Sequence, residues 1–228
     1  MTTLARRKLG LTHLDEKLSA GGYTLYAPQT GDGVVNLINI YGDIVHAWVL
    51  PVRPGRHAVL LPNGNLGYNG SHEKSANLYP AWDIWHGGHF MEVTRDGTIV
   101  WEYEDIYHHH DAQWLPNGNL LYTAAAQLVT SKYALKPNTL YSDVVKEVNR
   151  KGEVVWEWKI WEHIDPRRLP SHDIFDNSHW PMINGLCQTS DELVLMSLRT
   201  TSGIIAVNKS TDEIAWHIQY PRVAQQHC

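Results

Sequence analysis

The sequence has little cysteine and no apolar run long enough to cross a membrane. Cys187 and Cys228 are its only cysteines among 228 residues. That number excludes a disulfide framework, and no C-x-x-C metal or redox motif is present. The first residues lack the apolar core of a signal peptide, and no segment approaches the length of a membrane span. These absences predict a cytoplasmic protein with no membrane partner.

An excess of either charge is also missing. The 19 Lys and Arg residues against 24 Asp and Glu residues give a formal net charge of −5. No basic cluster occurs, so we expect no nucleic-acid partner. The nucleophile-elbow, zincin, Walker and dinucleotide motifs are absent, and no carboxylate pair indicates glycoside hydrolysis.

What the sequence does contain is a repeat. The segment Leu-Pro-Asn-Gly-Asn-Leu occurs at residues 61–66 and again at 115–120. Asn-Gly between two apolar runs predicts a β-hairpin, because both central residues can adopt a positive φ. An apolar segment that begins with histidine precedes each copy, at His57 and at His110. We therefore expect these two histidines at equivalent points of successive repeats.

A second repeated pattern consists of a strand, a turn with Gly or Asp, and a strand that ends in tryptophan. The sequence has 10 Trp but only 2 Phe, and recurring aromatic residues are typical of propeller blades. Together the two patterns make four antiparallel strands in about 50–60 residues, the size of one blade. Copies of the tryptophan pattern lie at residues 35–48, 90–103, 145–158 and, more loosely, 204–216.

These repeats predict an all-β fold, a single incomplete β-propeller domain over residues 1–228. About three to four blades are expected in the chain. The sequence stops in what reads as the inner strand of a further blade, and propellers close with about four to eight blades. We expect a second chain or a further C-terminal segment to complete the ring. The predicted blades lie at about 22–50, 57–103, 108–158 and 179–218, with the next one starting at 222–228.

Histidine dominates the candidates for chemistry. The innermost strands of a propeller line its channel, so the residues that open them converge, and histidine there can act as base, acid, nucleophile or metal ligand. Arg199 lies in an otherwise apolar strand and needs a partner if it is buried. A sulfate or phosphate oxyanion would supply that partner, and Asn184 could donate to the same group. The histidines at these positions are His57, His108, His109, His110, His179 and His227.

Five segments, in order along most of the chain, resemble the bacterial arylsulfotransferase family. The resemblance covers the N-terminal two-thirds of that family. It implies a propeller of six blades, with two blades beyond Cys228. It also implies transfer of a sulfuryl group from a phenol ester to another phenol through a sulfohistidine, without PAPS. The segments are residues 22–28, 109–121, 152–158, 197–199 and 226–227.

The resemblance also assigns roles to residues. His227 matches the nucleophile, and His110 and Arg199 match groups that bind and polarise the sulfate oxygens. The family's His-x-Asn motif reads Met182-Ile183-Asn184 here, so Met182 replaces a histidine. His179 and Trp180, which lie just before Met182, could take the place of the missing histidine. The further candidates for binding a small aromatic substrate are Asn184, His179, Trp180, His57 and His109. This interpretation needs no cofactor.

Two alternatives remain open from the residues. One is a different enzyme on the same propeller, with a transition metal (Cu, Zn, Fe or Ni) held in the channel by histidines. The other is a propeller without catalytic activity that binds a ligand or protein partner, since a fold alone does not imply chemistry. The expected metal ligands are His57, His110, His179 and His227.

Overall fold

The computed structural model describes residues 10–74, 87–128, 132–133, 141–175, 178–189 and 192–220. In these ranges the chain is almost entirely β, and the single helix is the one-turn α1 (Ile160–His163). No helix in the described residues has the length and hydrophobicity needed to span a membrane. The predicted all-β fold is confirmed.

Four antiparallel sheets follow one another along the chain, each a simple meander. The first has three strands instead of the predicted four, because no described strand pairs with the free edge of β1. The strands are β1 (Tyr23–Tyr26), β2 (Val34–Asn39) and β3 (Ile44–Val49); β4 (Pro54–Leu60), β5 (Leu66–Ser71), β6 (Gly88–Val93) and β7 (Ile99–Glu104); β8 (His108–Trp114), β9 (Leu120–Gln127), β10 (Tyr141–Val148) and β11 (Val154–Lys159), with β12 (His179–Trp180) parallel to β10; and β13 (Ile183–Gln188), β14 (Leu193–Leu198), β15 (Gly203–Asn208) and β16 (Glu213–Gln219).

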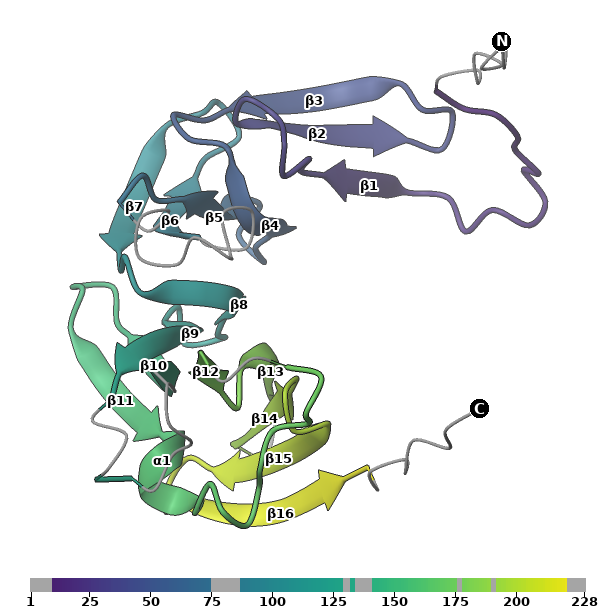
Figure 1. The fold of residues 1–228 in the computed structure, drawn as a ribbon. Coiled ribbons are helices and arrows are strands. Elements are labelled where there is room, and N and C mark those ends of the chain that lie inside the picture. The colour runs from purple at the N-terminus through teal and green to yellow at the C-terminus, as the bar shows by residue number, and fades with distance from the viewer. Residues whose placement is uncertain are drawn as a thin grey trace, which may run out of the picture.

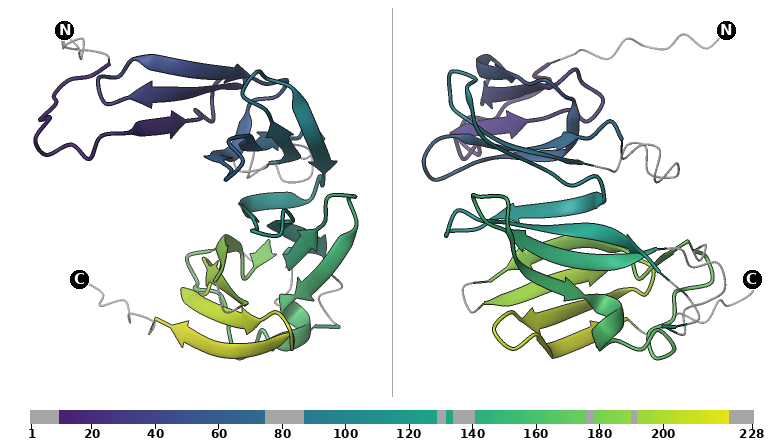
Figure 2. Two further views of the ribbon diagram at one scale, coloured as in Figure 1. Left: turned by 180° about the vertical axis from the view of Figure 1, so that it is seen from behind. Right: turned by 90° about the vertical axis from the view of Figure 1, so that its left-hand side faces the viewer.

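The sheets are arranged like propeller blades around an open arc (Figure 1). The first strands of the sheets, among them β4, β8 and β13, lie on the concave side, and β3, β7, β11 and β16 lie on the convex side. Figure 2 shows the same arc from behind and from one side. The number of blades in a closed ring stays a prediction.

The repeated hairpins form as predicted, but with a different turn. Gly64 N donates to Leu61 O, which closes a turn with Pro62 in its second position, where the fixed φ of proline fits a type I turn. Only the glycine that follows has positive φ (+84°), so the hairpin is a type I turn with a glycine bulge and not the two-residue turn expected from Asn-Gly.

The hairpin asparagines explain why the segment is repeated. Asn63 and Asn65 donate their amides to Glu92 Oε1 over 2.9 and 2.6 Å, and Arg150 from the next sheet binds the other oxygen of Glu92. The guanidinium of Arg150 also lies 4.7 Å from the ring centre of Trp101, a cation–π contact. We call Asn63, Asn65, Glu92 and Arg150 the latch between the second and third sheets.

A second latch joins the third and fourth sheets in the same way. Asn117 and Asn119 donate to Glu147 Oε1 over 3.2 and 2.5 Å, and Lys209 of the fourth sheet binds Glu147 Oε2. Trp156 donates its indole N–H to Asp212 Oδ1 at 2.7 Å, which adds a further contact between these sheets. The repeated asparagines and tryptophans are therefore residues that join neighbouring sheets.

Apolar cores fill the spaces between the sheets. The larger core extends from the second sheet, where it includes Phe90, to the fourth, and Trp158 and Ile205 are fully or almost fully buried in it. A smaller core between the first and second sheets contains Trp48 and Tyr68. Burial of such side chains contributes about 1.5–3 kcal/mol each, so these cores set the positions of the inner strands.

Candidate functional site

The inner strands of three sheets share an irregularity near their first residues. In β4, β8 and β13 the pairing register shifts between Pro54 and Ala58, between His108 and Ala112, and between Ile183 and Gly185. Such bulges redirect side chains and are common beside active sites. They lie at the opposite end of each inner strand from its hairpin, on strands that face the concave side of the arc (Figure 1).

The register corrects one expectation from the sequence. When residues are counted back from each hairpin, Arg56 in β4 is at the position equivalent to His110 in β8. By the same count, His57 is equivalent to Asp111. His57 and His110 are therefore not equivalent, because His57 stands one residue closer to its hairpin. The same count places Asn184 of β13 at the position of Arg56 and His110.

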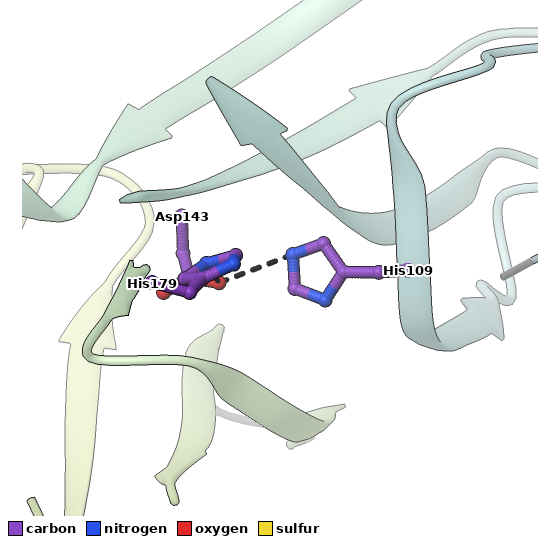
Figure 3. Close-up of side chains that lie close together, drawn as sticks. All are labelled: His109, Asp143 and His179. Atoms are coloured by element: carbon purple, nitrogen blue, oxygen red, sulfur yellow. Dashed lines mark hydrogen bonds and ion pairs between the residues drawn. The ribbon is translucent and has the colours of Figure 1, made fainter. Parts of the chain in front are cut away.

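A buried carboxylate lies at the centre of the histidine cluster. Asp143, at the start of β10, is fully buried. Its Oδ1 bonds to His179 Nε2 at 2.9 Å and lies 3.1 Å from His109 Nε2, an ion-pair contact (Figure 3). The backbone N–H of Met182 donates to Oδ2 at 2.8 Å. Strands β8, β10 and β12 thus meet at one acidic side chain.

Electrostatics keep Asp143 charged. Burial by itself raises the pKa of this carboxyl group, but the attraction of His179 and His109 and the hydrogen bond with His179 hold its pKa well below its usual range. For His109 the balance is reversed: burial lowers the pKa of the imidazole in spite of the attraction of Asp143. The arrangement is a buried carboxylate that lies between two buried imidazole rings.

His110 continues the cluster. Its Nδ1 lies 2.9 Å from Nδ1 of His109, and its backbone carbonyl accepts a hydrogen bond from Nε of Arg56. Burial, together with His109 and Arg56, lowers the pKa of His110 to about 2. The imidazole of His110 is therefore neutral at physiological pH, the form that can act as a nucleophile or proton acceptor.

Arg199 lies on the other side of Met182. Its Nη1 is 3.2 Å from the sulfur of Met182, and its guanidinium lies 5.1 Å from the ring centre of Phe175. The Arg199 residue is exposed and follows β14 directly. His110, His109, Asp143, Met182 and Arg199 therefore form one continuous series of contacts.

The comparisons with known proteins decide the family. The sequence model described as arylsulfotransferase (ASST) matches residues 101–227, which is more than half of the chain. The chain belongs to the arylsulfotransferase family. No curated protein matches the sequence.

Two solved structures, a hydrazine synthase and a protein of unknown function, share the fold of this arylsulfotransferase-family chain. Hydrazine synthase from Kuenenia stuttgartiensis matches 86% of the chain and 58% of its own length, with 9% identity and a TM-score of 0.57. A protein of unknown function from Bacteroides caccae matches 87% and 58%, with 15% identity and a TM-score of 0.50. Virginiamycin B lyase from Staphylococcus aureus matches 95% and 60%, with 15% identity and a TM-score of 0.49. The chain thus spans 58–60% of the length of these proteins.

The remaining predicted residues are held in different ways. Asn184 is exposed and accepts a hydrogen bond from Ser197 Oγ at 2.9 Å. Trp180 is buried and donates its indole N–H to the carbonyl of Leu169 at 2.8 Å. His57 is half-exposed, with its Nδ1 4.0 Å from Asp111 Oδ1. His227, the predicted nucleophile, lies outside the described residues.

His108 serves the fold. It is fully buried, its Nδ1 bonds to the carbonyl of Thr123 at 2.7 Å, and its Nε2 bonds to the amide of Asn69 at 3.0 Å. Nδ1 therefore joins β8 to β9 within the third sheet, and Nε2 joins the third sheet to β5 of the second. Burial lowers the pKa of His108 far below its usual value, so this residue is a neutral structural histidine.

The same cluster has the donors that a metal ion requires. His109, Asp143 and His179 each offer one ligand atom, and these atoms lie within 4.8 Å of one another. Two imidazole nitrogens and one carboxylate oxygen suit Zn, Fe or Cu. Of the expected ligands that the structure describes, which are His57, His110 and His179, only His179 belongs to this group.

Sequence reasoning missed Asp143 and Arg56. A signal for Arg56 was present, because it stands as far before the first hairpin as His110 stands before the second. Asp143 is an acidic residue at the start of an apolar strand, which marks a buried charge that needs partners. Nothing local in the sequence identifies His109 and His179 as those partners.

Proposed function

We propose that the protein transfers a sulfuryl group from an aryl sulfate to a phenol through a histidine intermediate. Membership in the arylsulfotransferase family supports the reaction class. The observation that carries the proposal is the series of contacts from neutral His110 through His109 and Asp143 to Met182 and Arg199. It combines an imidazole that can exchange protons with a guanidinium that can bind sulfate oxygens.

The proposed reaction is a double displacement. Nitrogen of His227 attacks sulfur, the bond between sulfur and the donor's aryl oxygen breaks, and the phenolate leaves with the electron pair. The oxygen of an acceptor phenol then bonds to sulfur, the sulfur–nitrogen bond breaks with its electron pair left on the His227 ring, and the phenol proton passes to the neutral imidazole of His110. Arg199 would stabilise the charge on the sulfate oxygens, as positioned cations do in transfer reactions. The reaction as proposed uses no cofactor, and a further segment or second chain would complete the propeller around the substrate.

The test is incubation with 4-nitrophenyl sulfate and a phenol acceptor. We expect rapid release of 4-nitrophenolate, a sulfuryl adduct on His227 in mass spectrometry, and transfer to the acceptor. His227→Ala should abolish all three, and His13→Ala, at an exposed histidine, should change none of them. Failure of the unmodified chain to release 4-nitrophenolate or form an adduct would reject this function.

A metal-dependent enzyme is the second candidate. The observation that favours it is that His109, His179 and Asp143 each offer one ligand atom, and that these atoms lie within 4.8 Å of one another. Elemental analysis after incubation with Zn, Fe, Cu or Ni tests it. Stoichiometric metal that is lost in His179→Gln would support a metal centre, and metal well below stoichiometry would count against it.

A further inference from the structure

We propose that His89, Glu102 and Glu104 bind a divalent transition-metal ion such as Zn²⁺ on the outer strands of the second sheet. Each of these side chains offers one ligand atom, and the three atoms lie within 4.8 Å of one another. Imidazole nitrogen and carboxylate oxygen are both ligands that Zn²⁺ takes, at about 2.0–2.2 Å. The site is separate from the buried histidine cluster, because its three ligands all lie on β6 and β7.

The register of β6 and β7 places the three side chains on one face of the sheet. His89 pairs with Glu104, and Met91, two residues after His89, pairs with Glu102. Side chains two residues apart in a strand point to the same face, so both carboxylates lie beside the His89 ring. Nε2 of His89 contacts Glu102 Oε1 and lies 3.7 Å from Glu104 Oε1. Ligand atoms around a tetrahedral Zn²⁺ are about 3.4 Å apart, so small side-chain rotations are enough to bind the ion.

His72 fixes the orientation of one of these carboxylates. It directly follows β5, and its ring is largely buried. Its Nδ1 accepts the backbone N–H of Lys74 at 3.2 Å, and its Nε2 bonds to Glu104 Oε2 at 3.3 Å. The other oxygen of Glu104, Oε1, faces His89. Carboxylates that bind metal ions are commonly held by a second hydrogen bond of this kind.

The third sheet has a different charge pattern at the same positions. β7 and β11 align through the tryptophan of each strand that pairs with the glutamate of a latch. By this alignment Glu157 corresponds to Glu102, and Lys159 corresponds to Glu104. Lys159 Nζ binds Glu157 Oε1 at 2.8 Å. The second sheet therefore has a second carboxylate where the third sheet has the cation that pairs with the first.

This exchange leaves two negative charges close together. Within the part of the chain that the structure describes, the ion-pair partners of Glu102 and Glu104 are the histidines His72 and His89. Like charges that approach on one face of a sheet destabilise it, and a dication between them removes the repulsion. Both carboxylates are about half-exposed, so an ion can reach them from solvent. The imidazole favours a transition metal over Mg²⁺ or Ca²⁺.

The ion would stabilise the end of the second sheet that carries the bulge of β4. Pro54, where this bulge begins, pairs with Gly70, Gly70 pairs with His89, and His89 pairs with Glu104. A metal ion between β6 and β7 would therefore fix the outer strands at the level where the inner strand places Arg56. Because β7 lies on the convex side of the arc (Figure 1), we assign the ion a stabilising role and no part in sulfuryl transfer.

The test is isothermal titration of Zn²⁺ into the full chain after treatment with a chelator. We expect the unmodified chain to bind Zn²⁺ at micromolar concentrations. His89→Gln should remove one equivalent of Zn²⁺, and His72→Gln should keep that equivalent but weaken its binding about 10–100-fold. His217→Gln, at an exposed histidine of the outer strand β16, is the matched control and should change neither the stoichiometry nor the affinity.

Two further variants separate this site from other zinc-binding groups. In His179→Gln, which lacks one ligand of the buried cluster, the equivalent assigned to His89 should remain, and Zn²⁺ should raise the melting temperature because it binds the folded chain. Glu104→Lys gives the second sheet the charge pattern of the third. It should abolish that equivalent, while the melting temperature of the metal-free chain stays the same or rises.

Two results would overturn the proposal. One is an unmodified chain that binds no Zn²⁺ at micromolar concentrations. The other is the same number of bound equivalents in His89→Gln and Glu104→Lys as in the unmodified chain. The melting temperature of metal-free Glu104→Lys shows whether this variant folds, so a loss of zinc is read separately from a loss of structure.

Discussion

Glu92→Gln should weaken the latch between the second and third sheets. The Glu92 side chain is 7% exposed and accepts hydrogen bonds from Asn63, Asn65 and Arg150. Glutamine has nearly the same shape but only one acceptor oxygen. Its amide NH₂ group would face one of the three donor side chains, which would then lose its acceptor. The substitution therefore changes charge and hydrogen bonding with little change in packing.

The magnitude follows from the contact that is lost. A hydrogen bond to a charged group contributes about 1.5–3 kcal/mol, and breaking a buried ion pair costs about 3–5 kcal/mol. The Arg150 side chain is 38% exposed, so water can hydrate its guanidinium once the partner is neutral. We therefore expect the free energy of unfolding to fall by about 2 kcal/mol at pH 7. Glu147→Gln, in the second latch, should produce a similar loss.

The loss should also depend on pH. Burial alone raises the pKa of Glu92, but hydrogen bonds from Asn65, Asn63 and Arg150 together lower it below its usual value. A carboxyl group whose pKa is lower in the folded state stabilises the protein above its unfolded pKa of about 4.3. That contribution disappears as the pH falls through the folded value. The difference between unmodified protein and variant should therefore shrink below about pH 4.

Urea unfolding followed by tryptophan fluorescence measures this difference, because Trp101 lies at the latch. Glu213→Gln is the matched control at an exposed position and should change the unfolding free energy by less than about 0.5 kcal/mol. The reasoning is refuted if Glu92→Gln behaves like that control at pH 7. It is also refuted if the variant is destabilised equally at pH 7 and pH 3.5.

Three further outcomes follow from the structure. His108→Ala should lower the unfolding free energy by about 3 kcal/mol, because it removes a buried ring and leaves the carbonyl of Thr123 without this donor; an unchanged urea midpoint would contradict this. Gly67→Ala should lower the melting temperature, since its new Cβ would lie 2.6 Å from the indole nitrogen of Trp114, and an unchanged melting temperature would mean that the indole moves aside freely. Met182→His should raise the rate of sulfuryl transfer about tenfold or more, because it places a donor beside Arg199 at a φ of 60° that histidine tolerates better than methionine. A rate equal to that of the unmodified chain would show that residue 182 takes no part in sulfate binding.

The repeats in the sequence were enough to predict the sheets. Asn-Gly placed both hairpins correctly, and the tryptophan pattern located the outer strands of the sheets, because these features depend on residues close together in the chain. The turn type was not predicted, since Pro62 favours a type I turn over the turn that Asn-Gly prefers elsewhere. The identity of Asp143 as the centre of the cluster depends on partners 34 and 36 residues away, which only the packed sheets bring together.

The two ends of each inner strand explain why the repeat predicts the fold better than the site. At the hairpin end of the second and third sheets, two asparagines donate to a glutamate of their own sheet, and that glutamate also binds a cation from the next sheet. The same contacts are needed at both junctions, so the residues there are similar. At the bulge end the equivalent positions hold Arg56, His110 and Asn184. A binding or catalytic site needs different chemical groups around one substrate, so the residues at these positions differ. Matching one histidine to another therefore gives the wrong equivalence there. Matching the register and not the residue type is what pairs Arg56 with His110, and the structure joins these two residues directly, because Arg56 Nε donates to the backbone carbonyl of His110.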